Sequence, residues 1–231
     1  MTPGAARPVC RAQFFVPSAV NTVIKNLGLA EYGSVWRAMQ DFTATRTAQT
    51  PDEIWLVQHH PVYTQGLNGK DEHLLDSNTG IPLVRTDRSG QITYHGPGQI
   101  VVYLLLDLAR LQLGVNDLVK TEELAIIDLL HGYGVSAWRK AGAPGVYVGG
   151  AKIAALGLRI KRGCCYHGAA LNVDMDLAPY RAINPCGYPG HAVTQTSSLG
   201  IKEAPEILGE QLAEKILRLV YAAREIPKNW I

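Results

Sequence analysis

An uninterrupted run of apolar residues, Ile100 to Leu106, sets the first requirement on any fold of this chain. Its β-branched start and its length are typical of a strand that is buried on both faces, so we interpret it as scaffold. The preceding stretch, Arg88 to Gln99, combines polar side chains with Gly90, Gly96 and Gly98, where the backbone can approach a ligand closely. Because functional loops are commonly held by rigid elements, we interpret this stretch as a ligand site. The alternative is a surface turn with a structural histidine.

The composition favours one domain. A chain of 231 residues suffices for a single buried core, and no low-complexity linker or repeat divides it. A net charge of +2 with 18% charged residues argues against a protein that binds nucleic acid. No apolar stretch reaches the roughly 18 residues of a membrane span, and the start of the chain lacks a signal-peptide pattern. We therefore expect a single cytoplasmic domain over residues 1–231, with about the first ten residues disordered.

Hydrophobic periodicity and turn residues predict the elements of this domain. Helices are expected over about 31–47, from Asn116 to Gly134, and from Pro205 to a point before Pro227. Strands are expected at 11–16, 53–58, 82–86, 100–106, 135–138, 145–148, 151–160 and 164–173. The last three form an antiparallel meander, because Gly149-Gly150 and Arg162-Gly163 suit tight turns. The segment 58–66 is expected to be a loop whose His59, His60 and Tyr63 either line a site or lie near the surface.

The meander strands are rich in small residues. These are Ala154, Ala155, Gly157, Gly168, Ala169 and Ala170. Small side chains inside strands leave space in which a ligand can lie. A tightly packed sheet is the other interpretation.

Lys152 and Cys186 differ in character from the residues around them. Lys152 is a cation in a mostly apolar strand, and Cys186 lies among helix and strand breakers rather than in an apolar run. A free thiol has a pKa of about 8.5 and is mostly protonated at neutral pH, so a cysteine nucleophile needs help to ionise. A partly desolvated lysine can accept the thiol proton and then stabilise the thiolate. Lys152 alone also fits a strand-end cation whose charge reaches solvent.

The four cysteines are too few and too irregularly spaced for a disulfide framework, so free thiols are expected. Cys164 and Cys165, with His167 nearby, invite a zinc interpretation. Successive strand residues point to opposite faces, however, so two adjacent cysteines do not readily share one ion. The sequence therefore argues against a metal site here.

Four segments resemble a known family when they are taken together and in order. They are Arg-Ser-Gly-Gln-Ile-Thr-Tyr-His-Gly-Pro-Gly-Gln, Gly-Val-Tyr-Val-Gly-Gly-Ala-Lys-Ile-Ala-Ala-Leu-Gly-Leu-Arg-Ile, His-Gly-Ala-Ala-Leu-Asn-Val and Ile-Asn-Pro-Cys-Gly-Tyr. They resemble the lipoyl(octanoyl) transferases, the octanoyl-acyl carrier protein:protein N-octanoyltransferases of lipoate biosynthesis. The resemblance spans about residues 30–200, which makes it far more specific than any single motif.

The resemblance implies an α+β fold: a single domain similar to the catalytic domain of biotin and lipoate ligases, with a mixed, largely antiparallel sheet flanked by helices. It implies a cofactor-free acyltransferase that catalyses the first step of endogenous protein lipoylation. The octanoyl group of octanoyl-acyl carrier protein would pass to Cys186 as a thioester, while Lys152 would lower the thiol pKa and relay protons. The acceptors would be lysine amines of lipoyl domains in 2-oxoacid dehydrogenases and of the glycine cleavage H protein. The enzyme would be a monomer without nucleic-acid or membrane partners.

The resemblance also carries substrate-binding residues onto this chain. The residues that would hold the acyl chain are Arg88, Ser89, Gly90, Gln91, Ile92, Thr93, Tyr94, His95, Ala155, Leu156, Gly157, Gly168, Ala169 and Ala170. Tyr94 and His95 would shape the mouth of the acyl tunnel, and Ala155 and Ala169 would set its depth. The chain departs from the family pattern at three of these positions, and also at Cys165, where the family tends to have serine. Ser89 replaces a usual glycine, Ala155 a common serine and Ala169 a usual leucine; the smaller side chains at 155 and 169 would widen or lengthen the tunnel.

Three other functions fit parts of the sequence. An ATP-dependent lipoate or biotin ligase would need phosphate-cradling glycines with adjacent cations, and no such loop is evident. A cysteine acyl-thioester hydrolase would use Cys186 with His167 or His191 and release free acid. A non-catalytic acyl-protein binding module would form no covalent adduct. A stable octanoyl adduct on Cys186 would separate the transferase from the binding module.

Overall fold

A computed structural model of the protein describes residues 22–185, 190 and 192–225. The strands are β1 Thr22–Ala30, β2 Asp52–His59, β3 Val62–Gln65, β4 Leu83–Arg85, β5 Ile92–His95, β6 Gln99–Leu105, β7 Trp138–Lys140, β8 Ala143–Val148, β9 Ala151–Lys161 and β10 Cys164–Asn172. The helices are α1 Tyr32–Thr45, α2 Leu108–Leu111, α3 Val115–Gly132 and α4 Pro205–Glu225. None of the helices within these described ranges is long and apolar enough to cross a membrane.

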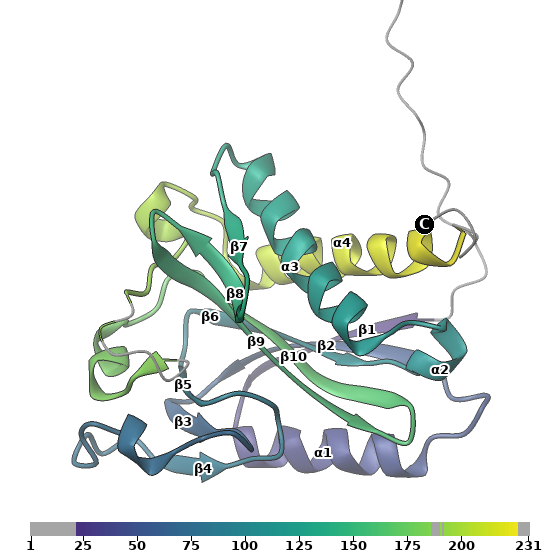
Figure 1. Cartoon of the computed structure of the whole chain (residues 1–231), viewed down its shortest axis with the longest axis horizontal. Helices are drawn as coiled ribbons and strands as arrows, with labels where there is room; N and C mark the ends of the chain where they lie inside the picture. The colour runs from purple at the N-terminus through teal and green to yellow at the C-terminus, as the bar shows by residue number, and fades with distance from the viewer. Residues whose placement is uncertain (1–21, 186–189, 191, 226–231) are drawn as a thin grey trace, which may run out of the picture.

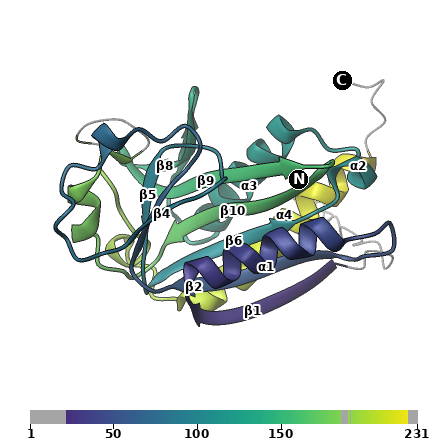
Figure 2. The ribbon, with the colours of Figure 1, turned by 90° about the horizontal axis from the view of Figure 1, so that it is seen from below.

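The described strands form a large mixed sheet and a small one (Figure 1). The large sheet has the order β1-β2-β6-β10-β9-β8-β7; β1 and β2 pair in parallel, and the other neighbours pair antiparallel. The small sheet has the order β4-β3-β5. Helix α1 covers one face of the large sheet, whereas α3 and α4 cover the other, as the two views show (Figures 1 and 2). The expected α+β fold, with a mixed and largely antiparallel sheet flanked by helices, is confirmed.

The apolar run identified in the sequence forms β6, which is buried along its whole length. Ile100, Val102 and Leu104 belong to the core beneath α3 and α4, whereas Val101 and Tyr103 belong to the core beneath α1. Alternate side chains of one strand thus pack against two different layers, which explains why the run shows no polar alternation.

The predicted meander is also confirmed, as the strands β8, β9 and β10. Its turns lie where the sequence placed them, and Gly149, Gly150, Arg162 and Gly163 all have positive φ. Such backbone angles are easily adopted by glycine, which is why the dipeptides were informative.

The segment 58–66, predicted to be a loop, contains the strand β3. Its residues pair in parallel with β4 and antiparallel with β5. Pro61 and Gly66 confine the strand to four residues, all of which are buried, so no alternation of polar and apolar residues was available to reveal it.

Two boundaries differ from the prediction. Helix α3 begins at Val115, with Gly114 rather than Asn116 at the N-cap. The strand predicted at 135–138 is β7, which begins only at the last of those residues. The strand predicted at 11–16 lies outside the described residues.

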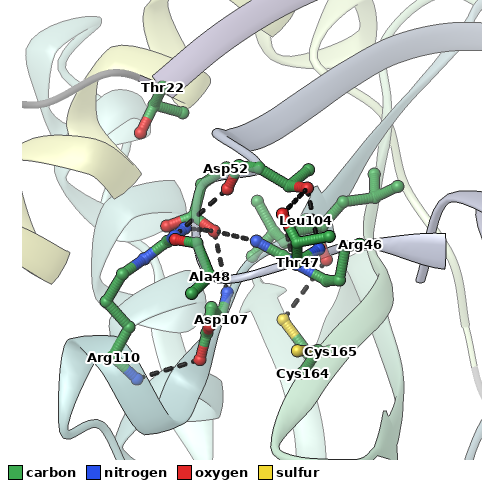
Figure 3. Close-up of polar contacts among 12 residues, drawn as sticks. Thr22, Arg46, Thr47, Ala48, Asp52, Leu104, Asp107, Arg110, Cys164 and Cys165 are labelled. Atoms are coloured by element: carbon green, nitrogen blue, oxygen red, sulfur yellow. Dashed lines mark hydrogen bonds and ion pairs between the residues drawn. The ribbon is translucent and has the colours of Figure 1, made fainter. Parts of the chain in front are cut away.

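A buried aspartate joins four elements at one end of the sheet (Figure 3). Asp52, at the start of β2, accepts hydrogen bonds from Arg46 Nη2 at 2.6 Å, Arg110 Nη2 at 2.7 Å and the backbone N of Asp107 at 2.8 Å. Arg46 follows α1, Asp107 follows β6, and Arg110 belongs to α2. The side chains of Arg46 and Asp52 are only 5% and 4% exposed. The charge of Asp52 is therefore compensated by two guanidinium groups, that of the buried Arg46 and that of the partly exposed Arg110.

Helix α3 carries a second buried carboxyl group, which lacks such compensation. Glu122 is 0% exposed, and neither of its carboxyl oxygens has a hydrogen-bond partner among the described residues. Burial, together with the neighbouring Glu123, raises the pKa of Glu122 well above its usual value. Burial therefore favours the protonated form of Glu122 in the folded protein.

We expect Glu122→Gln to increase the free energy of unfolding at pH 8 by more than about 1 kcal/mol and to change it little at pH 5. The wild-type protein loses stability as the pH rises from the unfolded pKa near 4.5 through the raised folded pKa, because unfolding then releases a proton. Glutamine has no proton to release. Urea unfolding at both pH values measures the difference, with the exposed Glu214→Gln as control; an equal effect at both pH values would contradict the expectation.

Candidate active site

A cavity of about 310 Å³ lies among the 88–93 segment, β9, β10 and the start of α1. All of the predicted substrate-binding residues except Tyr94 line it. The fold thus brings the 88–93 segment and the two small-residue strands, which are far apart in the sequence, to one cavity. Tyr32, Tyr103 and Val119 also line the cavity. Sequence reasoning missed these three, because each sits in an element with an apolar pattern that packing alone explains.

The 88–93 segment is hydrogen-bonded to both sheets. Arg88 is 8% exposed; its Nε donates to Thr64 Oγ1 at 3.1 Å, and its Nη2 donates to the carbonyl oxygens of Thr64 and Gln91. Ser89 exchanges two hydrogen bonds with Leu158 of β9: its N donates to the Leu158 oxygen at 2.9 Å, and its Oγ accepts from the Leu158 N at 3.1 Å. The serine that departs from the family pattern therefore adds a side-chain bond that glycine lacks.

One of the small residues that line the cavity, Gly168, is also required for close packing of two strands. A Cβ atom on Gly168 would lie 2.1 Å from the carbonyl oxygen of Val102 on β6, so glycine is required for the two strands to approach. Ala169 belongs to the core on the α3 side, whereas Ala170 belongs to the core on the α1 side. The two interpretations of the small residues, ligand space and tight packing, thus both apply, because these three residues pack in the sheet and also line the cavity.

Tyr94 and His95 point to opposite sides of β5, and neither is exposed. The Tyr94 ring packs against Tyr63 and Tyr180, with centroid distances of 5.6 Å to each. His95 lines the cavity, and its Nδ1 lies 2.6 Å from Gln99 Oε1. Burial lowers the pKa of His95 to about 3, so the ring is neutral. Both residues are buried, at 3% and 6% exposure, and their role at the mouth of the acyl tunnel stays a prediction.

Of the three residues in the 58–66 segment that were considered as site residues, two are buried and one is exposed. His59 is fully buried; its ring nitrogens lie 2.9 Å from the Ala30 oxygen and 2.8 Å from the Tyr103 hydroxyl. Burial lowers its pKa to about 4. His60 is exposed, and Tyr63 is buried in the small sheet. None of the three is among the cavity-lining residues.

Lys152 is buried, with 3% exposure. Its Nζ donates to the Pro144 oxygen at 3.0 Å and lies 5.1 Å from the centroid of the Tyr147 ring. A Cβ atom on Gly145 would lie 3.0 Å from this Nζ, so a glycine there makes room for the amine. The alternative interpretation of Lys152, a strand-end cation whose charge reaches solvent, is therefore wrong.

The segment that follows Cys186 in the sequence is hydrogen-bonded to Lys152, and the residue before Cys186 lines a cavity together with Lys152. The backbone N of Lys152 donates to the Ala192 oxygen at 2.8 Å, and its oxygen accepts from the Thr194 N at 2.9 Å. Pro185 lines a second, smaller cavity together with Lys152. Thr93 and Ala155 line both this cavity and the larger one. Cys186 itself lies outside the described residues.

The two adjacent cysteines of β10 face different surroundings. Cys165 lies in the core beneath α3 and α4, with its Sγ 3.2 Å from the Leu104 oxygen (Figure 3), whereas Cys164 Sγ faces the Arg162 oxygen. Burial raises the pKa of both thiols. The described part of the chain contains no group of three or more histidine, cysteine, aspartate or glutamate side chains placed to hold a metal ion.

Comparison with known proteins places the chain in a family. Residues 32–217 match the model of the lipoyl protein ligase A/B catalytic domain. An octanoyltransferase from Nitrosospira multiformis is 65% identical over 87% of this chain and 94% of its own length. Among solved structures, a bipartite lipoate protein ligase from Thermoplasma acidophilum matches with a TM-score of 0.67 and 14% identity, covering 87% of this chain and 84% of its own.

A biotin protein ligase from Aquifex aeolicus is more distant, with a TM-score of 0.52, 11% identity, and coverage of 88% of this chain and 71% of its own. These structural matches show a shared fold. The sequence matches go further, because the family model covers residues 32–217, a range that includes the cavity-lining segments, Lys152 and Cys186, and the identity to the octanoyltransferase is high over most of the chain. The chain belongs to the octanoyltransferase family, within the lipoyl protein ligase A/B catalytic domains.

Proposed function

We propose that this protein transfers an octanoyl group from octanoyl-acyl carrier protein, through a thioester on Cys186, to a lysine amine of a lipoyl domain. Its membership of the octanoyltransferase family supports an acyltransferase of lipoate biosynthesis. The proposed acceptors are lipoyl domains of 2-oxoacid dehydrogenases and the glycine cleavage H protein. The proposed enzyme is a cytoplasmic monomer that needs no cofactor.

The observation that carries this proposal is that the large cavity shares lining residues with the smaller cavity, which is lined by Lys152 and Pro185. The large cavity has walls of small and apolar residues such as Ala155, Leu156 and Ala170, which suit an alkyl chain. Burial of such a chain contributes roughly 0.8 kcal/mol per methylene. The residues shared by the two cavities lead from this space to Lys152 and to the residue before Cys186. The large cavity can therefore hold the acyl chain while the thioester carbonyl at the end of that chain lies near Lys152.

The chemistry follows from a thiol and an amine at this junction. Lys152 accepts the thiol proton of Cys186, and its ammonium stabilises the thiolate. The thiolate attacks the carbonyl carbon of the carrier thioester; a new C–S bond forms, the old one breaks, and the released carrier thiolate takes the proton from Lys152. In the second half, the neutral amine of the acceptor lysine attacks the Cys186 thioester. A C–N bond forms, the C–S bond breaks, and the surplus proton of the amine passes through Lys152 to the thiolate or to solvent.

An intact-mass measurement tests this mechanism directly. We expect the protein mixed with octanoyl-acyl carrier protein, without ATP, to gain the mass of one octanoyl group, and peptide mapping to locate it on Cys186. Addition of a lipoyl domain should discharge the adduct and octanoylate the domain. Absence of an adduct would indicate an acyl-protein binding module, release of free octanoate would indicate a hydrolase, and a requirement for ATP would indicate a ligase. Each of these results would overturn the proposal.

A further inference from the structure

His167 has an unusual backbone for a residue inside a strand. Its φ is 64°, a left-handed angle that residues other than glycine adopt at an energetic cost. Side chains of consecutive strand residues ordinarily point to opposite faces. Here the rings of Tyr166 and His167 stack instead, with centroids 5.0 Å apart. The left-handed turn thus brings His167 to the same side of β10 as Tyr166.

Both rings are held by one carboxylate, Asp87. It accepts hydrogen bonds from the Tyr166 hydroxyl and from His167 Nε2, the latter at 3.0 Å. Trp36 Nε1 and Gln40 Nε2 of α1 donate to the same group, at 2.8 and 3.2 Å. Burial alone would raise the pKa of Asp87, but these four donors outweigh it and hold the pKa well below its usual range. Asp87 is therefore an ionised acceptor that fixes the ring of His167.

This arrangement leaves one nitrogen of the ring without a partner. Because the carboxylate of Asp87 only accepts, the proton of a neutral His167 resides on Nε2, and Nδ1 is a bare acceptor. Burial lowers the pKa of His167, and Asp87 offsets only part of this effect. The residue is 1% exposed and lines the cavity, yet Nδ1 has no hydrogen-bond partner among the described residues. An unpaired acceptor of this kind is costly unless the ligand or water satisfies it.

The strand register sets the distance between His167 and the reactive end. The two cavities share Ala155, and His167 pairs with Leu158, three residues further along β9. At about 3.3 Å per residue, this separation is about 10 Å. An extended eight-carbon acyl chain spans about 9 Å from carbonyl to methyl, from ordinary C–C bond lengths. A chain whose carbonyl lies near Ala155 and which runs along β9 toward Leu158 would therefore end close to His167.

We propose that Asp87 and His167 form a polar end wall of the acyl cavity that restricts the bound chain to about eight carbons. The inference rests on the proposed function and names the residue that sets its chain-length specificity. The ring blocks further methylenes sterically, because Asp87 prevents it from swinging aside. A longer alkyl chain also displaces any water from Nδ1 and leaves that acceptor buried without a partner. Sites in which the wrong ligand leaves a buried polar group without a hydrogen-bond partner discriminate strongly between ligands.

Binding of straight-chain fatty acids of six, eight, ten and twelve carbons tests the end wall without requiring catalysis. For the wild-type protein, we expect the dissociation constant to reach its minimum at eight carbons. His167→Asn shortens the side chain, and asparagine tolerates the left-handed backbone; Asp87 keeps its other donors. We expect the affinity for decanoic acid relative to octanoic acid to increase at least about tenfold in this variant. The exposed His131→Asn is the matched control and should behave as wild type.

The same length dependence in wild type and His167→Asn would overturn the proposal, as would wild-type protein that binds dodecanoic acid as tightly as octanoic acid. A wild-type protein that binds octanoic acid with this length preference but forms no acyl-enzyme would instead overturn the proposed function and leave the end wall standing. Far-ultraviolet circular dichroism and thermal unfolding establish whether the variant is folded.

A second measurement needs no variant. We expect 8-hydroxyoctanoic acid to bind the wild-type protein about three- to tenfold more tightly than nonanoic acid, which has the same number of heavy atoms. Its terminal hydroxyl can donate to Nδ1 of His167, whereas the methyl group cannot. Weaker binding of the hydroxy acid, the result expected at an apolar cavity end, would contradict a polar wall.

Discussion

Cys186→Ser is expected to lower kcat/KM for octanoyl transfer by at least about 10³-fold and to leave the melting temperature unchanged. A serine hydroxyl ionises far less readily than a thiol, and one lysine does not compensate for that difference. Removing a covalent nucleophile also removes the intermediate, so the carrier thioester and the acceptor amine would have to react directly. The expected signature is loss of both the acyl adduct and the final product.

A coupled assay with a lipoyl domain as acceptor, together with intact-mass analysis, measures this effect. Cys164→Ser is the matched control, because that residue lies in β10 with its Sγ directed at the Arg162 oxygen, away from the junction of the two cavities. We expect the control to retain wild-type activity. Retention of full activity by Cys186→Ser would show that the acyl group does not pass through this residue.

Lys152→Ala is expected to slow formation of the acyl-enzyme by about 10²- to 10⁴-fold, the usual range for loss of a positioned acid–base group. The amine is buried beside Pro144 and Tyr147, so solvent is poorly placed to replace it. The pKa of Cys186 should rise in the same variant, because the thiolate loses its neighbouring cation. Lys152→Arg should fail to restore the rate, since arginine stays protonated and does not act as a base.

Rates of alkylation of Cys186 as a function of pH report the thiol pKa in the wild type and in both variants. Rapid-quench mass analysis reports the rate of acyl-enzyme formation. The exposed Lys140→Ala in β7 is the control for loss of a nearby cation. An unchanged Cys186 pKa in both Lys152 variants would remove this residue from the mechanism.

The strands of the two sheets could be predicted from the sequence wherever a local residue pattern marked a strand or a turn. Glycines at positive φ mark the turns of the meander, and the apolar run marks β6. The strand β3 had no such signal, because it has four buried residues between Pro61 and Gly66. Its identity as a strand depends on pairing with β4 and β5, which are distant in the sequence.

The candidate site was predictable as a set of segments but not as a geometry. The motif that contains Arg88 indicated the cavity wall, yet Asp87, the residue directly before it, was missed. Asp87 matters because four hydrogen-bond donors on α1 and β10 meet at its carboxylate. No local residue pattern predicts contacts between segments that are so far apart in the sequence. The left-handed backbone of His167 could not be foreseen either, because the periodicity of a strand predicts the opposite orientation.

The position of β10 between β6 and β9 has a consequence for how the protein is made. During synthesis, β6 emerges well before β10, and its pairing with β2 leaves its other edge open until residues 164–172 have been added. Until then the nascent chain has an unpaired strand edge with apolar side chains on both faces. Such edges promote aggregation between chains. Because β10 also supplies His167 and Ala170 to the cavity, the same late strand that closes the sheet completes the acyl site. A ribosome-bound chain that ends before β10 is therefore both inactive and prone to aggregate.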